Sequence, residues 1–396
     1  MKKKLKYNFF HLNCRKTILR LAVGIVFGAG FFILFPKINQ KSVEYLNING
    51  QNTVIQEKAV EKISHLQTPE PVKAIYMTSW VAGTSDWRNR LIEFIEKSEL
   101  NAVIVDIKDY TGRIAFEVSD PALVAVGSQE KRIPDIKEFI KNLHKKNIYA
   151  IARISVFQDI FLAKKRPDLA VKTKTNAVWK DYKGIPWLDP CSREVWDYTV
   201  KIAREAEQAG FDELNFDYIR FPSDGNMKNI TYPFCDLTNT LEAGLSSKAD
   251  MLEKFFRYLS DNLKDIDRPL SADLFGMVTV NTDDLNIGQV LEKAAPYFDY
   301  LAPMVYPSHY PAGFNNYKNP AAHPYEIVYQ AMTEASRRLI AASSTPQKLR
   351  PWIQDFDLGA DYTAEMVNLQ KKAVYDAGLT GWMAWDAGNK YTKEAY

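Results

Sequence analysis

Histidine and cysteine are scarce in this chain, which limits the metal and redox chemistry to be expected. Five histidines occur among 396 residues, and no two of them form the His-x-His pair of a zinc-binding first barrel strand. We therefore expect no metal site. Of the three cysteines, Cys191 and Cys235 follow neighbouring predicted strands and could form a disulfide. Because sequence alone sets no distance between them, we expect two unpaired thiols instead.

Several motifs of common enzyme classes are also absent. Residues 77–83, MTSWVAG, follow the first predicted strand and lack the glycines of a phosphate-binding turn, which argues against a doubly wound dinucleotide-binding sheet. The nucleophile elbow G-x-S-x-G of serine hydrolases is missing. The net charge is only +3, with 51 Lys and Arg against 48 Asp and Glu, and indicates no nucleic-acid partner. We expect no cofactor.

The one long hydrophobic run lies close to the N-terminus. Basic residues are frequent before it, and residues 21–35 are uncharged, with Ile18 and Leu19 extending the run toward the length of a membrane span. A cleaved signal peptide is the alternative, but no small-x-small cleavage site follows the run. We predict a basic cytoplasmic tail (1–17), a transmembrane signal anchor (18–35), a polar linker (36–71) and a main domain (72–396) outside the cytoplasmic membrane.

From residue 72 onward, strand-like and helix-like segments alternate. The predicted strands are 73–80, 102–109, 148–157, 211–221, 270–276, 300–306, 350–356 and 381–386. The predicted helices are 86–99, 135–146, 193–209, 248–264, 287–297, 325–341 and 364–377. About eight such units close a parallel barrel, so we predict an α/β protein with a (β/α)₈ TIM-barrel fold. No eighth helix is predicted, and the linker or a stub of residues 391–396 is expected to cover that side.

The segment 212–222, DELNFDYIRFP, has the aromatic residues of a buried strand but also carries charge. Period two places Glu213, Asn215 and Asp217 on one face of this strand and its apolar residues on the other. Asp217 then lies at the carboxyl end of the strand, where parallel barrels place their catalytic groups. A structural ion pair between Asp217 and Arg220, or another basic residue, is the alternative.

Besides Asp217, the ends of the predicted strands carry other side chains suited to binding or catalysis. Their ends carry Trp80, Asp106, Asp109, Arg153, Arg220, Asp273, Tyr306, His309, Gln354, Asp355, Trp385 and Asp386. Asp106 could simply pair with Lys108, and the buried cation Arg153 needs an anion such as Asp106 or Asp217. Asp273 is an isolated acid in an apolar strand, which favours a functional role. Trp80, Trp382 and Trp385 could be core residues or could stack on sugar rings.

Two acids at one cavity are typical of glycoside hydrolysis, in which one carboxyl protonates the leaving oxygen and the other attacks the anomeric carbon or activates water. We assign the nucleophile to Asp217, because Arg220 or Arg153 would keep it ionised. We assign the acid/base to Asp273, because its apolar strand should raise its pKa. The two roles could be exchanged.

Four motifs resemble a bacterial family of putative glycosyl hydrolase domains (domain of unknown function 4015), whose barrels are distantly similar to those of α-amylase-like glycoside hydrolases. They are residues 105–109 (VDIKD), 215–222 (NFDYIRFP), 302–310 (APMVYPSHY) and 381–387 (GWMAWDA). The resemblance implies an extracytoplasmic (β/α)₈ hydrolase that acts on a carbohydrate. In α-amylase-like barrels an Asp at the end of the fourth strand is the nucleophile, which matches Asp217. The general acid there is a Glu at the fifth strand, where this chain has Asp273, so the retaining outcome stays open.

These observations predict a membrane-anchored, extracytoplasmic glycoside hydrolase that cleaves a cell-wall or extracellular polysaccharide. The expected catalytic residues are Asp217 and Asp273. The expected substrate-binding residues are Trp80, Asp106, Arg153, Arg220, Tyr306, His309, Gln354, Trp385 and Asp386. The expected partners are a polysaccharide or oligosaccharide substrate and the cytoplasmic membrane. The alternative is a non-catalytic barrel that binds glycan as a wall-associated scaffold.

Overall fold

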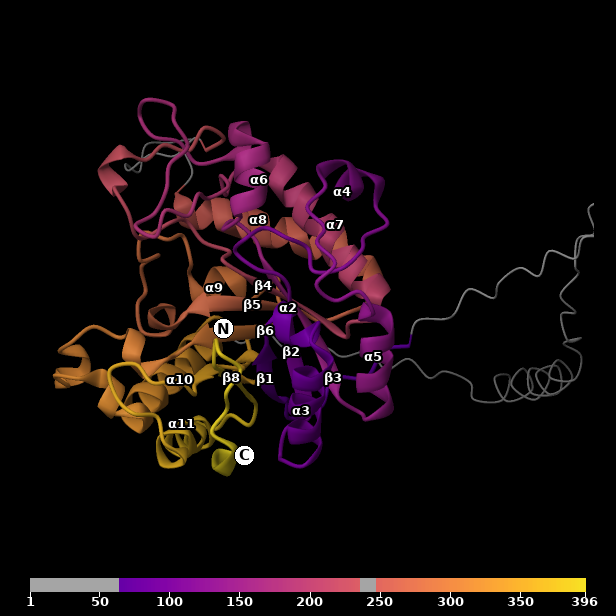
Figure 1. Cartoon of the computed structure of the whole chain (residues 1–396). Coiled ribbons are helices and arrows are strands. Elements are labelled where there is room, and N and C mark those ends of the chain that lie inside the picture. The colour runs from indigo at the N-terminus through magenta and orange to yellow at the C-terminus, as the bar shows by residue number, and fades with distance from the viewer. Residues whose placement is uncertain (1–63, 236–246) are drawn as a thin grey trace, which may run out of the picture. The chain divides into compact units, whose positions relative to one another are not determined.

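The computed structural model describes residues 64–235 and 247–396 (Figure 1). The predicted tail, the predicted anchor and the linker up to residue 63 lie outside the described residues. Within the described ranges, no helix is both long enough and apolar enough to cross a membrane.

Eight parallel strands form a closed barrel in the order β1 to β8, with β1 beside β8. The strands are β1 (Lys73–Met77), β2 (Ala102–Lys108), β3 (Tyr149–Ser155), β4 (Glu213–Asp217), β5 (Leu270–Phe275), β6 (Tyr300–Met304), β7 (Trp352–Gln354) and β8 (Trp382–Trp385). Each predicted strand contains one of these observed strands. The predicted (β/α)₈ barrel is therefore confirmed.

Helices surround the strands (Figure 1). They are α2 (Ser79–Ala82), α3 (Ser85–Glu96), α4 (Pro121–Val126), α5 (Ile136–Lys145), α6 (Ile160–Lys165), α7 (Arg193–Ala209), α8 (Lys248–Leu263), α9 (Leu291–Ala294), α10 (Pro324–Ala341) and α11 (Ala364–Asp376). Helix α7 has the predicted bounds and ends at Gly210, whose φ of 106° is in the left-handed region that glycine favours. The predicted helix 287–297 is wrong for its first part, because Asn286 and Gly288 have φ of 59° and 82° and the helix begins only at Leu291.

Two apolar layers hold the barrel together. Outward-facing residues such as Leu214 and Phe216 pack against the helices, whereas a smaller cluster that includes Tyr76 and Trp352 fills the barrel interior. On β4 the polar face points inward, where both carboxylate oxygens of Glu213 accept hydrogen bonds from Arg350 at 2.9 Å. The predicted alternation along β4 is thus confirmed.

Short segments before β1 and after β8 cover parts of the barrel that no helix covers. At the amino-terminal end of the strands, the Leu66 N–H donates to the Asp212 carboxylate at 2.7 Å, and the side chain of Leu66 packs against the interior cluster. After β8 the chain forms only the short 3₁₀ turn η9 (Lys393–Ala395). The Tyr391 hydroxyl donates to the Tyr76 carbonyl at 2.5 Å, so the stub of residues 391–396 covers the place of an eighth helix, as predicted.

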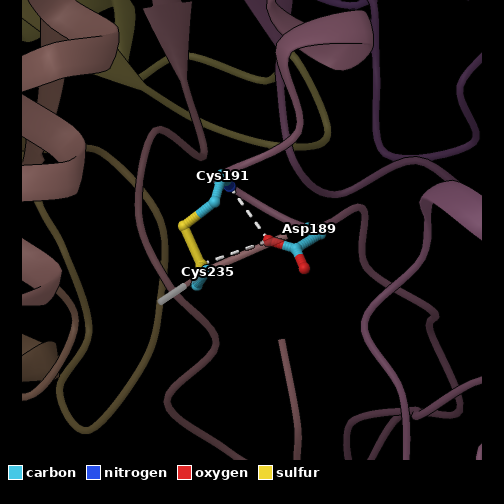
Figure 2. Close-up of side chains that lie close together, drawn as sticks. All are labelled: Asp189, Cys191 and Cys235. Atoms are coloured by element: carbon cyan, nitrogen blue, oxygen red, sulfur yellow. Dashed lines mark hydrogen bonds between the residues drawn. A yellow bond between two sulfur atoms is a disulfide. The ribbon is translucent and has the colours of Figure 1, made fainter. Parts of the chain in front are cut away.

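Cys191 and Cys235 form a disulfide (Figure 2). The expectation of two free thiols was wrong, because β3 and β4 are neighbours and the loops that follow them bring the two Cα atoms to 5.2 Å. The buried Asp189 carboxylate accepts hydrogen bonds from the N–H groups of Cys191 at 2.9 Å and Phe234 at 3.0 Å. The disulfide and this carboxylate together hold the loop after β4 against the loop after β3.

Candidate active site

A cavity of about 460 Å³ lies at the carboxyl ends of the strands. Residues from β3 to β8 and from the loops after them contribute to its wall. The lining residues are Arg153, Asp217, Tyr218, Arg220, Asp273, Phe275, Met304, Tyr306, His309, Trp352, Phe356, Leu358, Trp385, Asp386, Ala387 and Gly388. Most of its wall is apolar or aromatic, and its charged groups lie on one buried cluster and on the rim.

The buried cluster is centred on the guanidinium of Arg153. Its Nη1 donates to Asp106 Oδ1 at 2.5 Å, its Nη2 donates to Asp217 Oδ2, and its Nε lies 3.5 Å from Asp273 Oδ2. Burial lowers the pKa of Arg153, but the surrounding carboxylates raise it well above its usual value. Arg153 therefore remains positively charged, and its guanidinium brings the carboxyl groups of Asp106, Asp217 and Asp273 together.

Asp217 ends β4, and the strand pairing places it beside Ser155 of β3. Its Oδ1 accepts the N–H of Tyr218 at 2.5 Å, and its Oδ2 accepts the Arg153 hydrogen bond. Tyr218 has a φ of 53°, a left-handed conformation that costs a non-glycine residue energy and is often found at functional sites. The two hydrogen bonds fix the orientation of the Asp217 carboxylate at the end of β4.

Asp273 lies on β5 and is 1% exposed. Its Oδ1 accepts hydrogen bonds from Asn215 Nδ2 at 2.9 Å and Trp352 Nε1 at 2.7 Å. Its Oδ2 has no hydrogen-bond partner among the described residues. Burial, followed by the negative charge of Asp217, raises the pKa of Asp273 to about 8. This carboxyl therefore keeps its proton at neutral pH, while Asp217 beside Arg153 has the hydrogen bonds of an anion.

Asp106 belongs to this buried cluster but does not line the cavity. The Tyr76 hydroxyl donates to its Oδ2 at 2.5 Å, and burial raises the pKa of Asp106. The alternative pairing of Asp106 with Lys108 is wrong. A register shift between these two residues aligns Lys108 with Ile154, and Lys108 Nζ lies 2.9 Å from Asp159.

Aromatic rings form much of the remaining wall. Trp385 stacks on Tyr76 with ring centroids 3.9 Å apart, and the Arg153 guanidinium lies 4.9 Å from the Trp385 ring. On the loops after β6 and β7, His309 packs against Phe356 with centroids 6.2 Å apart. Burial and the nearby Lys183 lower the pKa of His309, which keeps the imidazole neutral. Apolar faces with a few polar groups are suited to sugar rings.

Several predicted site residues do not line the cavity. Trp80 lies on α2, is 59% exposed and stacks on Arg132 at 4.5 Å. Gln354 is buried behind the wall and accepts the N–H of Ser308 at 3.2 Å, so it positions the loop after β6. For Trp382, which was not among the expected site residues, the core alternative is confirmed. Asp106 contacts the cavity only through Arg153.

Part of the wall consists of residues that were not among the predicted site residues. The missed lining residues are Tyr218, Phe275, Met304, Trp352, Phe356, Leu358, Ala387 and Gly388. Trp352 could have been found, because period two along β7 places it on the same face as Gln354. The loop residues carry no comparable signal.

The described residues contain one group of His, Cys, Asp or Glu side chains close enough together to bind a metal ion, namely Asp189, Cys191 and Cys235. The two sulfur atoms are bonded to each other (Figure 2) and are therefore not thiolate ligands. This group also lies outside the cavity lining.

The model of a family described as "putative glycosyl hydrolase domain" matches residues 74–391. The chain belongs to this family. A hypothetical protein from Ruminiclostridium thermocellum is 31% identical, over 54% of this chain and 98% of that one, with a TM-score of 0.45. None of the curated proteins matches the chain.

Two solved glycoside hydrolase structures are similar to the barrel of this family member. The glycoside hydrolase domain of PgaB (BpsB) from Bordetella bronchiseptica is 14% identical, over 80% of this chain and 94% of that one, with a TM-score of 0.58. An exo β-N-acetylglucosaminidase from Vibrio harveyi is 10% identical, over 82% of this chain and 54% of that one, with a TM-score of 0.52. At these identities the likeness shows the shared fold.

Proposed function

We propose that this protein is a membrane-anchored, extracytoplasmic glycoside hydrolase that cleaves a cell-wall or extracellular polysaccharide. The observation that carries the proposal is the pair of acids in the cavity. Asp217 and Asp273 contact different nitrogens of the same Arg153 guanidinium and both line the cavity. Burial keeps Asp273 protonated, whereas both oxygens of Asp217 accept hydrogen bonds, which suits Asp273 to the acid role and Asp217 to the nucleophile role.

In the proposed reaction, the protonated Asp273 gives its proton to the glycosidic oxygen as that bond breaks. The Asp217 carboxylate attacks the anomeric carbon or removes a proton from the attacking water. Each oxygen of Asp217 accepts one hydrogen bond from a described residue and has a second lone pair for this step. Arg153 then positions both acids and offsets the negative charge of Asp217.

The extracytoplasmic location rests on the predicted anchor and is supported by the disulfide, because disulfides persist mainly in oxidising compartments. Fractionation of cells that express the full-length chain tests this part, with alkylation and non-reducing mass spectrometry of Cys191 and Cys235 on the same fractions. Recovery of the protein in the cytosol with free thiols would contradict it.

A glycan-binding scaffold is the second candidate, and one observation favours it. Asp217 is only 4% exposed and is already paired with Arg153, as a purely structural acid would be. Turnover separates the two candidates, since binding needs no proton donor.

The decisive experiment measures the release of reducing ends from a glycan panel by the full-length chain and by Asp217→Asn. We expect the variant to lose about 10²- to 10⁴-fold in rate, because it lacks the carboxylate that attacks or activates water. Asp159→Asn is the matched control, since Asp159 is equally buried and lies outside the cavity. Thermal melting checks that both variants fold. Turnover by Asp217→Asn at the wild-type rate would refute the assignment.

A further inference from the structure

Arg220 lines the cavity and forms no direct ion pair with any described residue. The fully buried arginines Arg153, Arg338 and Arg350 each form an ion pair. The half-buried Arg220 contacts no carboxylate of the described residues directly. Burial lowers the pKa of Arg220, although Asp217, Asp224 and Asp181 lie close enough to raise it in part. The guanidinium is therefore available to pair with the anionic group of a ligand.

The hydrogen bonds of Arg220 leave one edge of the guanidinium open. Nη1 donates to the Phe221 carbonyl at 3.2 Å and to Ser223 Oγ at 3.0 Å. Nε and Nη2 donate to no described residue, and neither is among the atoms sealed from solvent. The guanidinium of Arg220 also packs against two aromatic rings: its Cζ lies 4.9 Å from the ring centroid of Trp187 and 5.8 Å from that of Tyr218. The free Nε and Nη2 pair is the edge that binds a carboxylate through two parallel hydrogen bonds.

Charged side chains of both signs lie around the rim of the cavity. His309, which follows β6, lines the cavity and lies close enough to Lys183 for that cation to lower its pKa. The acidic rim residue Asp386 follows β8, which is opposite β4 in a closed barrel of this strand order. Asp181, Asp217 and Asp224 lie closer to Arg220 and raise its pKa, but none of them occupies its Nε and Nη2 edge.

We infer that the sugar bound beside the scissile bond is acidic and places its carboxylate on the Nε and Nη2 edge of Arg220. This inference rests on the proposed glycoside hydrolase function and specifies its substrate class. The carboxylate could be that of a uronic acid or that of a lactyl ether on an amino sugar. Because Arg220 and Asp217 lie in the same short segment, the acidic unit occupies the cavity next to the catalytic acids.

The test compares each acidic glycan with its own carboxyl-reduced form, so that linkage and length stay constant. The uronate probes are oligosaccharides of polygalacturonate, alginate and hyaluronan, and the lactyl-ether probe is peptide-free peptidoglycan strands. Initial rates of reducing-end release and calorimetric binding are both measured with the full-length chain. The class of probe that shows a preference for the acidic form identifies the source of the carboxylate.

We expect the wild-type protein to prefer an acidic probe over its reduced form, and Arg220→Gln to lower that preference about 10- to 100-fold, mainly through KM. Arg220→Lys keeps the positive charge but cannot form two parallel hydrogen bonds with a carboxylate. Its preference for the acidic probe should lie between those of the wild type and Arg220→Gln. Arg193→Gln is the matched control, because Arg193 also stacks on aromatic rings, at 4.7 and 3.9 Å, but lies on α7 outside the cavity. It should keep the wild-type preference.

Each outcome bears on one of the two proposals. Cleavage without any preference for the acidic form, or a preference that survives in folded Arg220→Gln, overturns the acidic-sugar inference and leaves the hydrolase standing. Absence of cleavage with Arg220-dependent binding of an acidic probe removes the hydrolase and supports the acidic site. Absence of both cleavage and Arg220-dependent binding overturns the inference.

Discussion

Replacing Asp273 by Asn should stabilise the fold at neutral pH while it disables the reaction. The amide is nearly the same shape and can still accept the hydrogen bonds that Asn215 and Trp352 donate to Oδ1. It differs in having no proton to release. The variant therefore separates the cost of keeping this acid buried from the packing around it.

The magnitude follows from the raised pKa. The folded-state pKa of Asp273 is about 8, and an unfolded Asp has a pKa of about 3.9. Between these values the unfolded chain has released the proton and the folded chain still holds it, so stability falls as pH rises, by about 1.4 kcal/mol per pH unit. Asp273 therefore costs about 4 kcal/mol between pH 4 and pH 7, and Asp273→Asn avoids this cost.

Urea unfolding of both proteins at pH 4, 5.5 and 7 measures the effect. We expect the stability difference between Asp273→Asn and wild type to grow in favour of the variant by about 4 kcal/mol over this range. A difference that stays constant with pH would refute the protonated, buried state of Asp273.

The pH dependence of turnover gives an independent measure of the same group. The wild-type rate should fall about tenfold per pH unit above pH 8, as Asp273 loses the proton that it must donate. Asp273→Asn should be about 10²- to 10⁴-fold slower and should lack this alkaline decline. Rapid turnover by the variant, with the decline retained, would assign the proton donor to another residue.

Two further predictions concern the surroundings of the site. Arg153→Met should lower the free energy of unfolding by about 3 to 5 kcal/mol, because it leaves Asp106 and Asp217 buried without their cation; denaturant unfolding near pH 7 checks this, and a loss below about 1 kcal/mol would contradict it. Replacing Cys191 and Cys235 together by Ser should cost about 4 kcal/mol, since the disulfide closes a loop with a sequence separation of 44. Thermal melting of this variant checks the second prediction, and melting that matches the oxidised wild type would contradict it.

Most of the barrel could be predicted because its signals are local. Both bounds of helix α7 were predicted correctly, because its apolar stripe ends at Gly210, which can adopt the left-handed conformation. The first half of the predicted helix 287–297 was wrong, because Asn286 and Gly288 have left-handed backbone conformations. These conformations depend on tertiary packing, which is tight here: a Cβ on Gly288 would lie 2.9 Å from Leu252. Short helices such as α4 and α6 lie inside loops and give too little periodicity to detect.

The site could be predicted only in outline. Acids at the ends of β4 and β5 follow from strand period, and the pairing of Arg153 with Asp106 or Asp217 follows from charge. The partner of Lys108 could not be predicted, because it depends on a register shift within β2. Trp80 was predicted at the cavity because the first strand was extended to residue 80, but β1 ends at Met77 and Trp80 lies within the short helix α2. Side-chain direction at a strand end depends on where the strand stops.

The tyrosine-rich stub that takes the place of an eighth helix also connects the barrel seam to the rim of the cavity. None of residues 391–396 lines the cavity, yet the Lys390 N–H just before them donates to the rim acid Asp386 at 2.9 Å. The Thr392 hydroxyl in turn donates to Asp355 at 2.7 Å, just beyond β7. Removing residues 391–396 would therefore weaken both the junction of β1 with β8 and the attachment of the chain just after β7.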